Sequence, residues 1–251
     1  MGGRSTERFS DRVENYIRYR PGYPPEVVEL LKNEAHLSEA SVVADIGSGT
    51  GISAEMLLKA GFAVTGVEPN GPMRGAAERL LAHYPKFSSV DGTARDTTLS
   101  GHSVDLILAA QAFHWFAKGE TSEEFSRILK PGGTIALLWN VRQLDTTPFL
   151  RDYEALLLRY ATDYTTVRHE TIDAKELAGF FIGEFTVHQF TNQQVFGYES
   201  LKGRLLSSSY APNSGQPGHE EMIAELERMF ARHQQDGTVS IDYITEVYLG
   251  A

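Results

Sequence analysis

The stretch Val42-Val43-Ala44-Asp45-Ile46-Gly47-Ser48-Gly49-Thr50-Gly51 decides the fold of this chain. Its first five residues are apolar apart from one acid, as in a buried strand, and the helical pattern of residues 53–60 follows directly. Three glycines between strand and helix let the backbone turn sharply and let a ligand come close. The stretch therefore predicts a strand, a ligand-binding turn and a helix.

Short apolar runs alternate with helical periods from Ser41 to Trp139, which is typical of βαβ units and a parallel sheet. Strands are expected at 42–46, 63–67, 87–90, 104–109 and 134–139, and helices at 53–60, 72–83 and 121–129. Two later candidates, 185–190 and 239–248, would complete seven strands. We expect one α/β domain with a Rossmann-like, doubly wound, mostly parallel sheet.

The segments outside this core are predicted to cover it. Residues 1–24 end in Pro21-Gly22-Tyr23-Pro24, a stiff turn before a helix that runs to about residue 33. Amphipathic helices are expected at 153–161 and 222–230, and the turn-rich stretch 207–218 is long for a compact domain. We expect a helical N-terminal lid at 1–24, a ligand-binding core at 40–140 and a C-terminal cap with a lid insertion at 190–238.

Composition narrows the possible partners and the possible compartment. The chain has 33 acidic and 23 basic residues, and no basic block follows residue 20, which argues against nucleic acid as a partner. It has no cysteine, and its eight histidines are dispersed, so no metal site is expected. Since no apolar run approaches the roughly 20 residues of a membrane span, we expect a cytoplasmic protein. Its expected oligomeric state is a monomer or a homodimer.

A second acidic position supports a nucleoside ligand. Glu68 ends the second predicted strand about 20 residues after the glycine turn, where a carboxylate can accept hydrogen bonds from ribose hydroxyls. A helix-capping or solvated carboxylate is the alternative role for Glu68 taken alone. Ile52 stands where a dinucleotide fingerprint would have its third glycine, so a ligand without a diphosphate is favoured.

Four motifs in order resemble those of class I methyltransferases, and the resemblance covers roughly residues 40–140. They are Asp45-Ile46-Gly47-Ser48-Gly49-Thr50-Gly51, Val67-Glu68-Pro69-Asn70 with Met73, Asp91-Gly92-Thr93-Ala94, and Leu129-Lys130-Pro131-Gly132-Gly133. Gln111-Ala112-Phe113-His114-Trp115-Phe116 and Tyr16-x-x-Tyr19-Arg20-Pro21-Gly22-Tyr23-Pro24 further resemble a subgroup that includes the trans-aconitate methyltransferases.

The resemblance implies S-adenosylmethionine as cofactor and assigns a part of it to each motif. Its amino acid end would be held by the first motif, and its ribose by Glu68. The adenine would meet the next residues along the chain, and Gln111 would lie near the transferable methyl. The implied cofactor-binding residues are Asp45, Gly47, Ser48, Gly49, Gly51, Glu68, Pro69, Asn70, Met73, Thr93, Ala94 and Gln111, with Arg20 as a candidate for the cofactor carboxylate.

The acceptor side is predicted after the fourth and fifth strands, at the carboxyl edge of the sheet. His114 is the best placed group to act as a base toward a neutral acceptor, although packing in an aromatic cluster explains it equally well. An acidic acceptor would need arginines, and Arg20, Arg142 and Arg204 are the candidates, each with a surface ion pair as the alternative. Four aromatic residues are candidates to cover the pocket: Tyr16, Tyr19, Trp115 and Tyr210.

Three functions are compatible with these patterns. The leading interpretation is methyl transfer from S-adenosylmethionine to a small molecule, at a carboxylate or hydroxyl, with His114 and Arg142 as catalytic candidates. A non-catalytic module that binds the same cofactor is the second. A nicotinamide-dependent oxidoreductase is the third, and Ile52 argues against it.

Overall fold

The computed structural model describes residues 13–116, 118–162, 164, 177, 180–181 and 183–251. These residues form one seven-stranded sheet with strand order β3-β2-β1-β4-β5-β7-β6. The strands are β1 Val42–Ile46, β2 Ala63–Val67, β3 Phe87–Val90, β4 Val104–Ala110, β5 Leu129–Arg142, β6 Thr186–Phe196 and β7 Val239–Gly250. β1 to β5 are parallel, while β7 runs antiparallel to both β5 and β6. The predicted doubly wound, mostly parallel sheet is confirmed.

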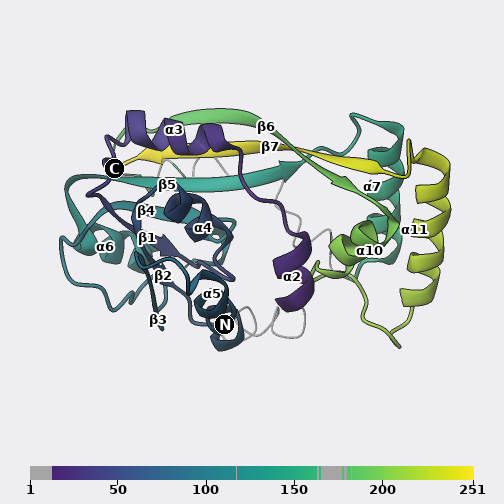
Figure 1. Ribbon diagram of the computed structural model, residues 1–251, viewed down its shortest axis with the longest axis horizontal. Coiled ribbons are helices and arrows are strands. Elements are labelled where there is room, and N and C mark those ends of the chain that lie inside the picture. Colours follow the sequence, from purple (N-terminus) through teal and green to yellow (C-terminus); the bar gives the residue numbers. More distant parts are fainter. Residues whose placement is uncertain (1–12, 117, 163, 165–176, 178–179, 182) are drawn as a thin grey trace.

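Helices cover both faces of this sheet (Figure 1). They are α2 Val13–Tyr19, α3 Pro25–Glu34, α4 Ile52–Lys59, α5 Gly71–Leu81, the 3-10 helix η2 Phe113–Trp115, α6 Lys118–Ile128, α7 Pro148–Tyr160, α10 Tyr198–Leu206 and α11 His219–His233. One buried cluster joins α3 and α4 to alternate residues of β1, β4 and β5. A second joins α6 to the other face of the same strands. Burial on both faces explains why these strands read as continuous apolar runs.

The predicted elements of the core lie within a few residues of those observed. The first three strands match their predicted bounds, and α5 begins with Pro72 in its first turn and Asn70 as its N-cap. β5 and β6 are longer than predicted, since β5 starts at Leu129 and β6 continues to Phe196. α10 lies in a region for which no helix was predicted.

Three strands extend well past the core. The last pair between β4 and β5 is Ala110 with Leu138, whereas β5 continues beside β7 to the pair Arg142 with Tyr243. Figure 1 shows β5, β6 and β7 running from the core to α7, α10 and α11, which pack over their far end in a third apolar cluster. These three helices and the strand ends beneath them are called the cap below. The predicted cap at 190–238 begins inside β6 and omits α7.

The N-terminal segment packs against the cap. α2 contacts α10 closely enough that a Cβ built on Gly203 would lie 2.0 Å from the ring of Tyr19. Arg20 donates a hydrogen bond to the carbonyl of Ser207, at the end of α10 (3.1 Å). Residues 1–12 of the predicted lid lie outside the described residues. Within the described part of the chain, no helix has the length and apolar character needed to cross a bilayer.

Candidate active site

The glycine turn after β1 has the backbone geometry that its sequence requires. Gly47, Gly49 and Gly51 have φ angles of +71°, +56° and +88°, a region that favours glycine. A Cβ on Gly47 would also lie 2.7 Å from the Cβ of Ala112. The turn therefore tolerates no side chain at its first glycine, and it leaves bare backbone at the carboxyl edge of the sheet.

Glu68 closes this turn from the next strand. One carboxylate oxygen accepts a hydrogen bond from the backbone N–H of Gly49 (2.9 Å), and the other accepts one from the N–H of Asn70 (2.8 Å). The side chain is buried, and burial raises the pKa of its carboxyl. Each oxygen has further lone pairs, so Glu68 is held in place and can still accept from a ligand hydroxyl.

Asp45 lies on the same side of the turn and is fully buried. Its Oδ2 accepts a hydrogen bond from Ser53 (2.7 Å), while its buried Oδ1 has no partner among the described residues. Burial raises the pKa of Asp45 to about 7, and the negative charge of Glu68 adds to this rise. A positively charged ligand group near these two carboxylates would favour the ionised form of both.

The rim of the turn is built from β2 and α5. Ser48 packs over Gly66, where a Cβ would lie 2.8 Å from its Oγ. Asn70 caps α5 by accepting from the N–H of Met73 (3.0 Å), whose side chain comes within 3.6 Å of a Cβ built on Gly49. The buried Asn70 and Met73 and the half-buried Pro69 therefore lie together beside the turn.

Sequence reasoning missed Arg74, which supports this rim. Its guanidinium donates to the carbonyl of Glu68 (2.7 Å) and to the carboxylate of Asp91 (3.0 Å). A basic residue on the first turn of α5 was the only signal for Arg74 in the sequence, and such residues are usually solvated.

Thr93 and Ala94 lie in a tight turn after β3. The backbone of Thr93 closes this turn by two hydrogen bonds with the backbone of Asp96, one in each direction (2.8 and 3.2 Å).

Gln111 sits at the end of β4 in a left-handed conformation, with φ of +56°. Its side chain donates to the carbonyl of Asn140 (3.3 Å), and its N–H donates to the carbonyl of Leu138 (2.8 Å). Strained backbone of this kind at a strand end is often found at functional sites. The structure therefore places Gln111 at the edge of the sheet that carries the glycine turn.

His114 lies in η2, three residues after Gln111. It is half-buried, and its ring centroid is 4.7 Å from that of Trp115, which is 41% exposed. Phe113 anchors η2 in the core through edge contacts with Trp139 and Phe180. η2 therefore presents one ionisable ring and one exposed aromatic ring, while its first residue fixes its position.

Arg142 and Arg204 both lie in the cap and are largely buried. Arg142 donates through Nη2 to Glu154 and to the hydroxyl of Tyr164 (2.6 Å), so it forms a buried ion pair rather than a surface one. Arg204 has an exposed fraction of 6% and donates to Tyr243 (3.4 Å) and Ser208 (3.2 Å).

The remaining candidates are placed as follows. Arg20 binds the Ser207 carbonyl, and so belongs to the contact between α2 and α10. Tyr19 packs on Gly203, and the ring of Tyr210 contacts that of Tyr164 (5.0 Å). The side chain of Tyr16 lies outside the described part of the structure.

Asn140 is a further residue that sequence reasoning did not single out. It donates to the carbonyl of Gly22 (3.1 Å), and its Oδ1 accepts from Thr245 (2.6 Å) and Asn192 (3.1 Å). It therefore ties the Pro-Gly turn of the N-terminal segment to β5, β6 and β7. These three partners of Asn140 are more than 50 residues away along the chain, so spacing offered no signal.

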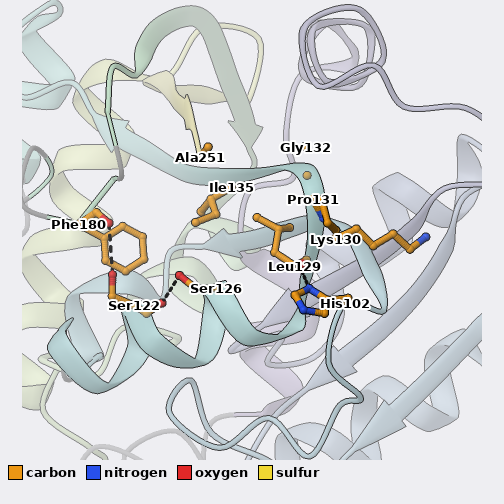
Figure 2. Close-up of a pocket in the computed structure, with 11 residues that line it drawn as sticks. His102, Ser122, Ser126, Leu129, Lys130, Pro131, Gly132, Ile135, Phe180 and Ala251 are labelled. Atoms are coloured by element: carbon orange, nitrogen blue, oxygen red, sulfur yellow. Dashed lines mark hydrogen bonds between the residues drawn. The ribbon is translucent and has the colours of Figure 1, made fainter.

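A separate cavity of about 290 Å³ lies at the opposite edge of the sheet (Figure 2). It is lined by His102, Lys130, the Pro-Gly-Gly turn and Ala251, where β4 and β5 begin and β7 ends. Its position at the amino ends of the parallel strands separates it from the glycine turn. Among the residues described, no group of three or more acidic or histidine side chains is arranged to hold a metal.

Comparison with known proteins decides the family. A family model described as a methyltransferase domain matches residues 44–137. A methyltransferase-like protein of Schizosaccharomyces pombe is 33% identical over 244 residues, which cover 96% of this chain and 93% of the relative. The chain belongs to the class I methyltransferases. Its cofactor is S-adenosylmethionine, and the family assignment favours a methyltransferase over the non-catalytic module and over the oxidoreductase.

Solved structures agree on the fold of this methyltransferase. One assigned as a type II methyltransferase from Anaeromyxobacter dehalogenans has a TM-score of 0.65 at 19% identity, covering 92% of this chain and 97% of that one. A methyltransferase from Thiobacillus denitrificans, in complex with S-adenosylhomocysteine, has a TM-score of 0.53 at 19% identity, covering 96% and 97%. At such identities the likeness extends to the fold alone.

Proposed function

We propose that this methyltransferase transfers the methyl group of S-adenosylmethionine to a small-molecule acceptor, at a carboxylate or a hydroxyl. The observation that carries the proposal is the contact between Glu68 and the glycine turn, because it fixes a carboxylate beside bare backbone at the carboxyl edge of the sheet. Open α/β sheets bind their ligands at this edge.

The residues of the turn fit the parts of the cofactor. Glu68 would accept hydrogen bonds from the ribose hydroxyls, and Asp45, with its unpartnered buried oxygen, would face the cationic amino acid end. Gly47, Ser48, Gly49 and Gly51 would give the backbone approach. Pro69, Asn70, Met73, Thr93 and Ala94 would border the adenine, and Gln111 would lie toward the methyl.

When bound, the cofactor supplies an electrophilic methyl group on a sulfonium. Displacement at that carbon requires alignment of the acceptor and exclusion of water more than it requires acid or base groups. The strained Gln111 and the η2 segment after it would shape the acceptor side. His114 would accept the proton of a neutral hydroxyl, whereas a carboxylate acceptor needs no base.

The cap supports a small acceptor. α2 and α10 pack together next to the overhanging strands, so residues 13–24 and the cap border the space beyond the carboxyl ends of β4 and β5. Arg142, through the Glu154 pair, would orient groups on that side. The proposal also includes a single-domain organisation, a lid role for residues 1–24, and a monomeric or homodimeric cytoplasmic state.

An assay for released S-adenosylhomocysteine, run over a panel of metabolite acids and phenols, tests the proposal. We expect turnover with at least one small acid or phenol, and its loss in Glu68→Gln. Glu78→Gln, an exposed change on α5, is the matched control and keeps full activity. Binding of S-adenosylhomocysteine without turnover on any acid or phenol would contradict the small-molecule assignment.

A further inference from the structure

The cap contains more buried positive charge than its described residues balance. Arg142 and Arg204 are 11% and 6% exposed, and arginine stays protonated even when buried. Glu154 is the carboxylate paired with Arg142, and no described carboxylate pairs with Arg204. Two guanidinium groups therefore share one carboxylate among the residues described.

Both arginines have donor capacity left over. Nη1 of Arg142 is buried and has no hydrogen-bond partner within the described residues. Arg204 uses Nε and Nη1, in bonds of 3.4 and 3.2 Å to two hydroxyl groups, and its Nη2 has no acceptor in the same set. Leaving Nη1 of Arg142 in this state costs free energy, because this N–H group loses water without gaining an acceptor.

The residues around the two arginines are mainly tyrosines, which cannot supply the missing charge. The guanidinium of Arg142 lies 5.3 Å from the ring centroid of Tyr153, and Tyr153 and Tyr210 interact electrostatically with both arginines. Burial raises the pKa of Tyr153 and of Tyr164, so these phenols are neutral at physiological pH. They line the site as hydrogen-bonding, aromatic walls.

The position of this cluster connects it to the acceptor side. Arg142 and Tyr243 form the last pair of β5 and β7, four residues beyond the point where β4 ends against Leu138. At about 3.3 Å per residue, this places Arg142 on the order of 13 Å further along the strand. Asn140 lies between Leu138 and Arg142 on the same face of β5, and its backbone carbonyl accepts a hydrogen bond from the Gln111 side chain.

We propose that Arg142 and Arg204 form a subsite for a carboxylate group of the acceptor, distinct from the atom that is methylated. The inference rests on the proposed function, since it concerns the same acceptor. Counted over the described residues alone, one carboxylate would bring the cluster to charge balance with Glu154, whereas a phosphate dianion would exceed it. Arginine suits this role because its planar fork can bind both oxygens of a carboxylate.

The subsite explains a feature that packing alone leaves unaccounted for. Replacing a buried charge by an apolar side chain of similar volume is often neutral or stabilising, so a fold that needed only packing here would be served by methionine. Ligand sites commonly retain such groups at a cost in stability. Acceptors with two acidic groups, one methylated and one bound at Arg204, are thus the substrate class that the cap fits.

Calorimetry on the full-length protein saturated with S-adenosylhomocysteine tests the subsite. The probes are malonate, succinate and phthalate, each compared with its neutral diamide and with inorganic phosphate. We expect at least one dicarboxylate to bind saturably and its diamide not to bind. Arg204→Met should weaken that binding about ten- to a hundredfold, the usual loss for hydrogen bonds to a charged group. Arg228→Met, in an exposed pair with Glu225, is the matched control and should change nothing.

Each other outcome overturns the subsite. It fails if no dicarboxylate binds the wild type, if phosphate binds more tightly than every dicarboxylate, or if Arg204→Met binds the dicarboxylate as well as the wild type does. Should Arg204→Met not fold, Arg204→Lys keeps the charge and loses the fork, and unchanged affinity in that variant would decide against the idea. If the wild type binds S-adenosylhomocysteine but no dicarboxylate, the subsite is refuted and the proposed function is not. If the wild type binds neither S-adenosylhomocysteine nor a dicarboxylate, the proposed function is refuted.

Discussion

Replacement of Asp45 by asparagine should stabilise the ligand-free protein at high pH more than at low pH. The Asp45 side chain is fully buried, and its pKa is raised from 3.8 to about 7. Between these two values the folded state holds a proton that the unfolded state has lost, so stability falls as the pH rises from about 4 to 7. Asparagine does not titrate, and it retains an oxygen that can accept from Ser53.

The size of the effect follows from the raised pKa. Each pH unit between the two pKa values contributes about 1.4 kcal/mol, so the full cost of ionising Asp45 in the fold is roughly 4 kcal/mol as an upper bound. Between pH 5 and pH 8 the folded group loses its proton near pH 7. The free energy of unfolding gained by Asp45→Asn should therefore be about 2 to 3 kcal/mol larger at pH 8 than at pH 5.

Urea denaturation followed by tryptophan fluorescence at pH 5, 6.5 and 8 measures this difference. Asp145→Asn, an exposed change, is the control and should show no pH-dependent gain. A gain in Asp45→Asn that is the same at all three pH values would refute the argument that the buried carboxyl titrates near neutrality. The variant should also bind S-adenosylhomocysteine more weakly, which would separate stability from function at this position.

Three further predictions concern the turn and the cap. Wild-type affinity for S-adenosylhomocysteine should fall up to about tenfold per pH unit below pH 7, because Asp45 must release its proton to face an ammonium group; calorimetry against pH measures this. Glu68→Gln should weaken the same binding about ten- to a hundredfold, since a neutral amide accepts less strongly from ribose hydroxyls. Gly203→Ala should cost about 1 to 3 kcal/mol and speed tryptic cleavage after Arg18, because its Cβ would collide with Tyr19.

Matched changes make these tests specific. Affinity that stays flat from pH 5 to 8 would show that Asp45 does not meet the cationic end of the ligand. Glu78→Gln should leave binding unchanged, and equal loss in both glutamine variants would point to a general effect of charge. Gly75 is a helical glycine on which a built Cβ would meet nothing within 4 Å, so Gly75→Ala should add up to about 1 kcal/mol of stability. The same gain in Gly203→Ala would contradict the close packing of α2 on α10.

The sequence by itself determined the core and the glycine turn after β1. These depend on short-range signals: apolar runs that strands buried on both faces require, glycines that positive φ angles require, and an acid at the end of the next strand. The sharp turn at Gly47, Gly49 and Gly51 and the position of Glu68 beside it were therefore predicted from spacing. The start of α5 followed in the same way, since a first-turn proline such as Pro72 acts locally.

Only the tertiary structure decided which residues meet in the cap. In the sequence Arg204 is one of three candidate arginines, and its burial depends on the packing of α10 against β7, where it donates to Tyr243. Arg142 and Glu154 meet because β5 extends past β4 far enough to reach α7, and Asn140 joins segments more than 100 residues apart. Such contacts depend on strand length and on how helices pack over the overhang, and these are set by long-range burial that no local pattern records.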